Sequence, residues 1–135
     1  MRAVSRILGS MNRSPIKVAI ADDHYLTRSG FRRYLGSFDD VEVVGEANDA
    51  FEALELVQRE EVDVLILDYS MPGMTGLTAL PRILECAPDT RVVMVSSMPA
   101  DMLRDRALRA GACEYVEKSS GPERLEQAIR AAAAS

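Results

Sequence analysis

Three carboxylates stand directly after short apolar runs in this chain. Asp68 follows the run Val64–Leu67, and the pair Asp22 and Asp23 follows the run Val18–Ala21. A carboxylate at the end of a buried strand is unfavourable unless a charge, a metal ion or a reaction uses it. Open parallel sheets bind their ligands at the carboxyl ends of their strands. The spacing therefore predicts one shared site built from the three acids.

A hydroxyl and an ammonium group follow two later apolar runs, at Ser96 and Lys118. In a sheet of order 2-1-3-4-5 these strand ends lie beside those that carry the acids. Carboxylate oxygens are ligands that Mg2+ prefers, together with phosphate oxygens and water. A hydroxyl and an ammonium can hold phosphoryl oxygens, and a carboxylate can accept a phosphoryl group covalently. The set of side chains predicts a site for a divalent cation and a phosphoryl group.

Composition narrows the classes of function. The 135 residues fit one domain, and the net charge of −5 argues against nucleic-acid binding by this chain itself. One histidine and no CxxC pair argue against a zinc site. We expect Cys86 and Cys113 to be reduced and buried in a cytoplasmic protein. No apolar run approaches the roughly 18 residues of a membrane span, and membrane binding is not expected.

Apolar runs alternate with amphipathic segments along the chain. The runs predict strands over Ile16–Ala21, Val41–Ala47, Val62–Leu67, Arg91–Ser96 and Cys113–Glu117. The amphipathic segments predict helices over Tyr25–Leu35, Asp49–Glu60, Leu77–Cys86, Asp101–Ala110 and Pro122–Ala134. Pro81 should kink the third helix or delay its start. The alternation predicts an α/β fold, a (βα)5 doubly wound parallel sheet of flavodoxin-like strand order 2-1-3-4-5.

Four segments resemble the receiver domain of two-component response regulators, in the subfamily attached to LuxR-type (NarL/FixJ-like) helix-turn-helix domains. They are Val18–His24, Leu65–Gly76, Val92–Ser97 and Gly111–Lys118. The four segments occur in the family's order and at its spacing, and the resemblance covers nearly the whole chain. We expect a flexible N-terminal arm at residues 1–14 and a receiver domain at residues 15–135.

The resemblance implies a cytoplasmic signalling switch that catalyses only its own phosphorylation and dephosphorylation. A sensor histidine kinase would phosphorylate it with Mg2+ bound. The surface formed by Asp101–Ala110, Cys113–Glu117 and Pro122–Ala134 would then change to control an output. We expect transcription regulation, with phosphorylation-linked homodimerisation and DNA bound by a C-terminal helix-turn-helix domain outside these 135 residues. The alternative is a stand-alone receiver that acts by protein–protein interaction.

The resemblance also implies roles for individual residues at the predicted site. Asp68 matches the phosphoacceptor and a metal ligand, and Asp23 matches the direct Mg2+ ligand. Asp22 matches the acid that holds the metal through water, and the backbone carbonyl of Ser70 matches a further ligand.

Three further residues match the family's phosphoryl-binding lysine and its two switch residues, Ser96 and Tyr115. Ser96 matches the hydroxyl that swings to the phosphoryl group, and Lys118 matches the lysine that pairs with that group. Tyr115 matches the aromatic residue that changes rotamer with the hydroxyl. Ser70 and Met98 occupy positions that tune autodephosphorylation in this family. Because a methionine side chain cannot position water by hydrogen bonding, we expect a long-lived phosphoryl state.

Other classes match parts of the pattern. A phosphatase of the haloacid dehalogenase kind needs a second aspartate two residues after Asp68, where this chain has Ser70. A cobalamin-binding loop needs glycine where this chain has Thr27. A receiver-like partner that works without phosphorylation is disfavoured by the complete set of acids and Lys118. His24, next to the acid pair, is interpreted as a helix-start residue with no catalytic role.

Overall fold

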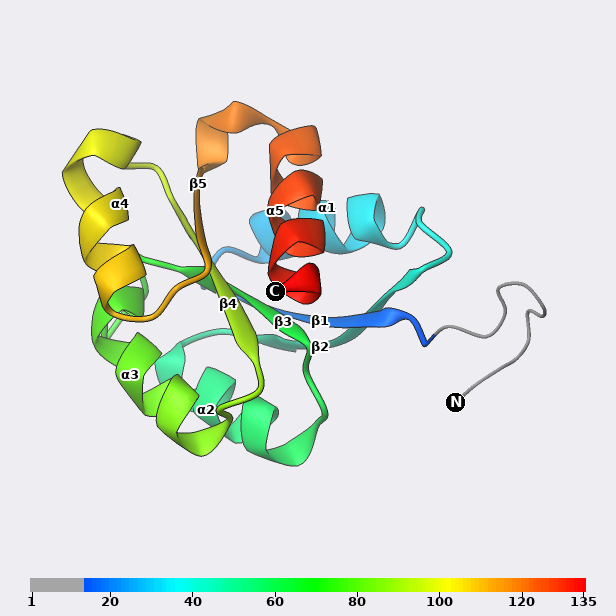
Figure 1. Ribbon diagram of the computed structural model, residues 1–135, viewed down its shortest axis with the longest axis horizontal. Helices are drawn as coiled ribbons and strands as arrows, with labels where there is room; N and C mark the ends of the chain where they lie inside the picture. Colours follow the sequence, from blue (N-terminus) through cyan, green and yellow to red (C-terminus); the bar gives the residue numbers. More distant parts are fainter. Residues whose placement is uncertain (1–13) are drawn as a thin grey trace.

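In the computed structural model, which describes residues 14–135, five parallel strands form one sheet with helices on both faces (Figure 1). The strand order β2-β1-β3-β4-β5 confirms the predicted topology. The strands are β1 (Ile16–Ala21), β2 (Val41–Ala47), β3 (Val64–Asp68), β4 (Arg91–Ser96) and β5 (Glu114–Glu117). The arm expected at residues 1–14 lies outside the described residues, apart from Ser14.

Five α-helices and one short 3₁₀-helix connect the strands. The helices are α1 (Tyr25–Leu35), α2 (Ala50–Arg59), α3 (Gly76–Cys86), α4 (Ala100–Arg109) and α5 (Pro122–Ala134). The 3₁₀-helix η1 (Lys118–Ser120), which the sequence pattern did not predict, leads from β5 to α5. No helix of residues 14–135 is long and apolar enough to cross a membrane.

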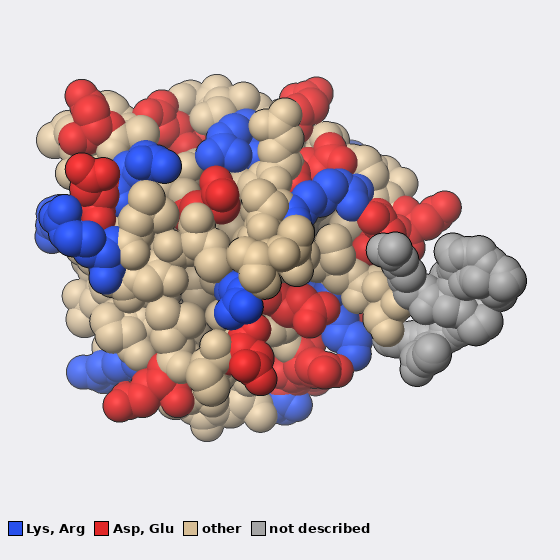
Figure 2. Space-filling model, in the orientation of Figure 1, with Lys and Arg blue, Asp and Glu red and all other residues tan. Residues whose placement is uncertain are grey.

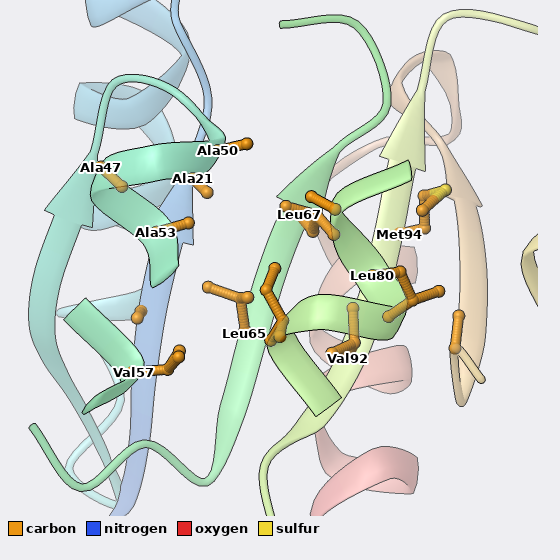
Figure 3. Close-up of a cluster of buried hydrophobic side chains, with 14 of the residues drawn as sticks. Ala21, Ala47, Ala50, Ala53, Val57, Leu65, Leu67, Leu80, Val92 and Met94 are labelled. Atoms are coloured by element: carbon orange, nitrogen blue, oxygen red, sulfur yellow. The ribbon is translucent and has the colours of Figure 1, made fainter. Parts of the chain in front are cut away.

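Alternate residues of the central strands supply two separate cores. Leu65 and Leu67 of β3 pack in the cluster between the sheet and helices α2 and α3. Val92 and Met94 of β4 belong to the same cluster (Figure 3). Val64 and Ile66 of β3 point the other way, into the cluster under α1 and α5. This alternation follows from the two-residue period of a strand. Because both faces of β3 are covered, its last residue, Asp68, is carried into a buried position.

Local sequence explains where two of the helices begin. The Asp49 side chain accepts a hydrogen bond from the Glu52 amide at 2.9 Å and caps α2. Thr75 caps α3 in the same way, by accepting from the Thr78 amide at 3.2 Å. The helix α3 begins at Gly76 and continues through Pro81, so the proline does not delay its start.

The expectation for the cysteines is wrong in part. Both thiols are free, but Cys86 is exposed and Cys113 is only partly buried. Cys86 is the last residue of α3, where the helix leaves the core, and its sulfur accepts a hydrogen bond from the Gln58 amide at 3.3 Å. Because α3 ends outside the core at this point, the Cys86 side chain is open to solvent.

The start of α3 lies directly against the end of β3. The Gly76 amide donates to the Tyr69 carbonyl oxygen at 2.8 Å, which closes the intervening turn. A Cβ atom on Gly76 would clash with the backbone carbonyl oxygen of Asp68. Glycine is therefore required at this position by the close approach of two backbones.

We expect Gly76→Ala to lower the free energy of unfolding by about 1–3 kcal/mol, because the added methyl group forces α3 away from β3. Gly30→Ala is the matched control, since nothing lies within 4 Å of a Cβ atom at that position of α1. The control should raise the free energy of unfolding by about 0.5–1 kcal/mol through helix propensity. Equilibrium urea unfolding measures both changes. Effects of the same sign in the two variants would contradict this account of Gly76.

Candidate functional site

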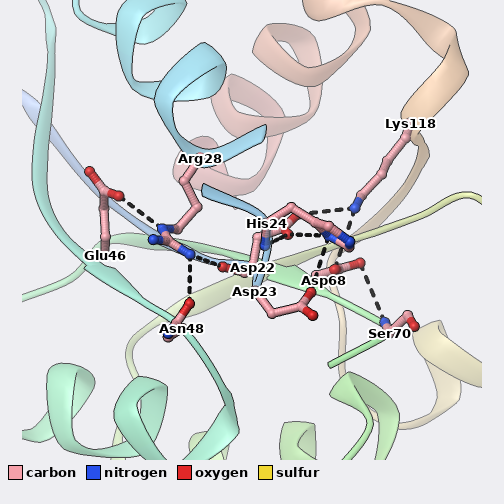
Figure 4. Close-up of polar contacts among 9 residues, drawn as sticks. All are labelled: Asp22, Asp23, His24, Arg28, Glu46, Asn48, Asp68, Ser70 and Lys118. Carbon is pink, nitrogen blue, oxygen red and sulfur yellow. Dashed lines mark hydrogen bonds and ion pairs between the residues drawn. The ribbon is translucent and has the colours of Figure 1, made fainter. Parts of the chain in front are cut away.

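The acids after β1 and the acid that ends β3 meet at the carboxyl edge of the sheet (Figure 4). Strands β1 and β3 are paired in register, with Ala21 opposite Leu67, so Asp22 and Asp68 follow neighbouring positions. Asp22 is fully buried and Asp68 is 1% exposed. Ligand atoms of Asp22, Asp23, Asp68 and His24 all lie within 4.8 Å of one another. The structure thus brings the three predicted acids together, and it adds His24 to them.

Lys118 reaches the acids from the end of β5. Its Nζ atom lies 3.0 Å from Asp22 Oδ2 and 3.3 Å from Asp68 Oδ2. These two oxygens and Asp23 Oδ1 receive no hydrogen bond of good geometry from any residue of the described chain. One ammonium therefore faces several carboxylates. Buried oxygens without hydrogen bonds are unfavourable, and oxygen-rich clusters of this kind suit a hard divalent cation.

Burial and the neighbouring charges together set the pKa values of the site. Burial, reinforced by the neighbouring carboxylate of Asp22, raises the pKa of Asp68 to about 6, although Lys118 and the Ser70 amide act in the opposite direction. Burial disfavours the charged form of Lys118, but its contacts with Asp22 and Asp68 outweigh burial and raise its pKa above the ordinary value. Lys118 therefore stays an ammonium group, and Asp68 holds its negative charge at a cost.

Arg28 holds the backbone of the loop that carries Asp22 and Asp23. Its guanidinium group donates to the backbone carbonyl oxygen of Asp22 at 2.5 Å and to Asn48 Oδ1 at 2.9 Å. It also pairs with Glu46 on β2, with Nε 3.0 Å from Oε1. The interpretation of the sequence missed this residue. An arginine near the start of a helix, where the helix dipole disfavours a cation, was the signal that could have found it.

The predicted switch residues lie close by but do not touch the acids. Ser96 is 2% exposed, and its Oγ accepts a hydrogen bond from the Met98 amide at 3.0 Å. The Tyr115 hydroxyl, from β5, donates to the Met98 carbonyl oxygen at 2.7 Å. Within residues 14–135, Ser96 makes no hydrogen bond to Asp68 or Lys118. Both polar groups of the Met98 backbone are therefore held by side chains on neighbouring strands.

Ser70 begins the turn after β3. Its amide donates to Asp68 Oδ1 at 3.3 Å, and the residue is exposed to solvent. The expected role of its carbonyl oxygen as a metal ligand stays a prediction. The arrangement as a whole can hold a divalent cation on the acids and place an ammonium beside the carboxylate of Asp68.

The profile of the response regulator receiver domain family matches residues 18–130. The chain is 39% identical to the response regulator GacA of Pseudomonas aeruginosa over 115 residues, which are 85% of this chain and 54% of that protein. The chain thus spans about half the length of the curated relatives it matches.

Solved structures give the same result. The signal receiver domain of the response regulator NarL from Mycobacterium tuberculosis is 34% identical, with a TM-score of 0.84 over 90% of this chain and 98% of that chain. A LuxR-family two-component response regulator from Aurantimonas is also 34% identical, with a TM-score of 0.85 over 90% of this chain and 86% of that chain.

We expect the contribution of Asp68 to the free energy of unfolding of the metal-free chain to fall as the pH rises from about 4 to about 6. The pKa of Asp68 in the folded chain, about 6, lies above the ordinary value of 3.8. Between these values the folded chain binds the proton and the unfolded chain does not, so the stabilisation by that proton is lost as the pH rises through this window. Urea unfolding in EDTA at several pH values measures the decline.

The variant Asp68→Asn should lack this part of the decline. At pH near 7.5 its free energy of unfolding should exceed that of the wild type by about 2–3 kcal/mol, because each pKa unit corresponds to about 1.4 kcal/mol. Asp105→Asn removes an exposed acid of α4 and controls for the change in net charge. A stability difference between wild type and Asp68→Asn that did not depend on pH would contradict the raised pKa.

Proposed function

The chain belongs to the response regulator receiver family, in its LuxR-type, NarL-like branch, and we propose that it is a phosphorylation-activated switch whose phosphoacceptor is Asp68. A sensor histidine kinase would supply the phosphoryl group. The observation that carries the proposal is the Asp68 carboxylate itself. It is buried at a strand end, one of its oxygens lacks a hydrogen bond, and an ammonium group lies 3.3 Å from that oxygen.

The reaction would be an in-line transfer. A carboxylate oxygen of Asp68 attacks phosphorus, the bond between phosphorus and the kinase's imidazole nitrogen breaks, and the imidazole leaves with the electron pair of that bond. The raised pKa of Asp68 makes its carboxylate more basic, and it is still largely ionised at neutral pH. The Lys118 ammonium, which now pairs with Asp22 and Asp68, would bind a phosphoryl oxygen of the acyl phosphate.

The acids would hold the cofactor Mg2+. Asp22, Asp23 and Asp68 would supply carboxylate oxygens, and Ser70 its backbone carbonyl. The fit rests on two observations: the ligand atoms lie within 4.8 Å of one another, and three carboxylate oxygens lack hydrogen bonds in residues 14–135. Bound Mg2+ would offset the negative charge of the acids and of the incoming phosphoryl oxygens.

A conformational signal would start at Ser96. Its hydroxyl would turn to a phosphoryl oxygen and release the Met98 amide, which it now holds at 3.0 Å. Tyr115 would lose its 2.7 Å contact with the Met98 carbonyl and change its rotamer. A second contact joins the same elements, because the Glu117 carboxylate of β5 accepts a hydrogen bond from the Ala100 amide of α4 at 2.5 Å. Movement of this loop would therefore reach the surface formed by α4, β5 and α5.

The output is proposed to be transcription regulation in the cytoplasm. The LuxR-type relatives support this, and DNA would be bound by a further domain, with phosphorylation-linked homodimerisation of the receiver. The distribution of charge on the receiver surface favours DNA binding by a separate domain. Acidic and basic side chains are interspersed over the face in Figure 2, and that face has no continuous basic patch for a nucleic acid. A stand-alone receiver that acts by protein–protein interaction is the alternative.

Incubation with acetyl phosphate and Mg2+ should add one phosphoryl group to the wild type and none to Asp68→Asn, as measured by intact mass. EDTA should abolish the gain, because the acids then lack the cation that offsets their charge. Asp105→Asn, the exposed control on α4, should be labelled like the wild type. Equal labelling of wild type and Asp68→Asn would overturn the assignment of the phosphoacceptor.

The phosphoryl group should be long-lived, since the Met98 side chain cannot orient a water molecule by hydrogen bonding. We expect Met98→Gln to shorten the lifetime by about fivefold, which corresponds to one hydrogen bond of about 1 kcal/mol. Met102→Gln is the matched control, because Met102 is 60% exposed on α4. The decay of the phosphorylated mass after removal of acetyl phosphate gives the lifetime. A wild type that decays as fast as Met98→Gln would refute this role of Met98.

A further inference from the structure

The imidazole of His24 lies at the edge of the acid cluster. Its Nδ1 atom is 3.1 Å from Asp22 Oδ1 and 3.1 Å from Asp23 Oδ1 (Figure 4). His24 is the residue before α1, yet its side chain makes no capping hydrogen bond to that helix. The side chain is 62% exposed, so packing does not force the ring toward the acids. Within residues 14–135 the polar contacts of the ring are with these two carboxylates, and the His24 backbone amide also donates a hydrogen bond to Asp22 Oδ1 at 2.8 Å.

The separations match those between neighbouring ligands of one metal ion. In an octahedral site with bonds of about 2.1 Å, adjacent ligand atoms are about 3.0 Å apart and opposite ones about 4.2 Å apart. The two 3.1 Å distances from His24 Nδ1 correspond to two edges of such an octahedron. The whole group, including Asp68, spans 4.8 Å and would need to contract by about half an ångström.

A second observation also indicates a cation at this place. Asp22 is fully buried and Asp68 is 1% exposed, and each has a carboxylate oxygen that lacks a hydrogen bond from residues 14–135. Lys118 supplies one positive charge between them, which leaves the cluster with excess negative charge. The imidazole therefore stands beside oxygens that already require a cation.

We propose that His24 is a nitrogen ligand of this site when an imidazole-binding divalent ion such as Zn2+ or Ni2+ occupies it, and that it strengthens the binding of such ions relative to Mg2+. The inference rests on the metal site of the proposed function and adds a ligand to it. Mg2+ is a hard cation that takes oxygen ligands and retains water, whereas imidazole binds zinc and nickel strongly. A carboxylate cluster without His24 would not discriminate between these ions in the same way.

The experiment uses the whole chain without any histidine tag. Because the chain has one histidine, every imidazole signal comes from His24. Isothermal titration with Zn2+ and with Mg2+ should show that His24→Ala weakens Zn2+ binding about tenfold or more and changes Mg2+ binding less than about threefold. His24→Asn, which restores a residue favoured before a helix, should behave like His24→Ala and excludes fraying of α1 as the cause. Leu26→Ala, which changes an 81% exposed side chain of α1, should bind both ions like the wild type.

Nitrogen NMR of the chain labelled with 15N-histidine gives a readout that a structural role would not change. Added Zn2+ should shift the Nδ1 resonance of His24, the nitrogen that faces the acids. An unshifted Nδ1, or equal weakening of Zn2+ and Mg2+ in His24→Ala, would overturn this inference. If the inference about His24 fails but Asp68 is still phosphorylated with Mg2+, the proposed function stands. If Zn2+ binding depends on His24 but acetyl phosphate does not label the chain, His24 is a metal ligand and the proposed function is rejected.

Discussion

The contact of the Lys118 ammonium with the buried carboxylates of Asp22 and Asp68 is the interaction on which the site depends. It joins the ends of β1, β3 and β5 through two ion pairs of 3.0 and 3.3 Å. Without a cation, two buried carboxylates this close would repel each other, and at least one would take up a proton. Burial and the Asp22 carboxylate raise the pKa of Asp68 to about 6 even with Lys118 present, so one ammonium does not fully offset the cost of this buried charge. The remaining excess of negative charge favours a divalent cation here, and such a cation would offset the charge of an incoming phosphoryl group.

The backbone at the ends of β1 and β3 and the backbone of the loop after β4 are held by different kinds of contact. Arg28 fixes the Asp22 carbonyl, and the close packing of Gly76 fixes the end of β3. The loop after β4 is held differently, since its Met98 backbone depends on single hydrogen bonds to Ser96 and Tyr115. In the proposed switch, this difference would keep the acids in place while the neighbouring loop moves. A chemical change at Asp68 would then reach the outer surface of α4 and β5.

Much of the fold could be predicted because local patterns decide it. The bounds of β1, β2, β4, α1 and α5 follow from runs of apolar residues and from the proline at the start of α5. The predicted start of β3 at Val62 was wrong by two residues, because the pairing of β3 with β1 and β4 begins at Val64. The exposure of Cys86 was also missed, since it depends on how the end of α3 lies over α2.

The sequence by itself determined which groups stand at the strand ends, and hence the parallel sheet, the family and the three acids with Lys118. Those properties depend on local spacing and on strand order, which the alternation of elements already specifies. Only the tertiary structure decided how these groups interact: that Lys118 bridges two of the acids, that Arg28 binds the Asp22 carbonyl, and that the His24 ring turns toward the carboxylates. Distances of about 3 Å between residues up to about a hundred positions apart, and the burial that sets a pKa, arise from packing and not from spacing along the chain.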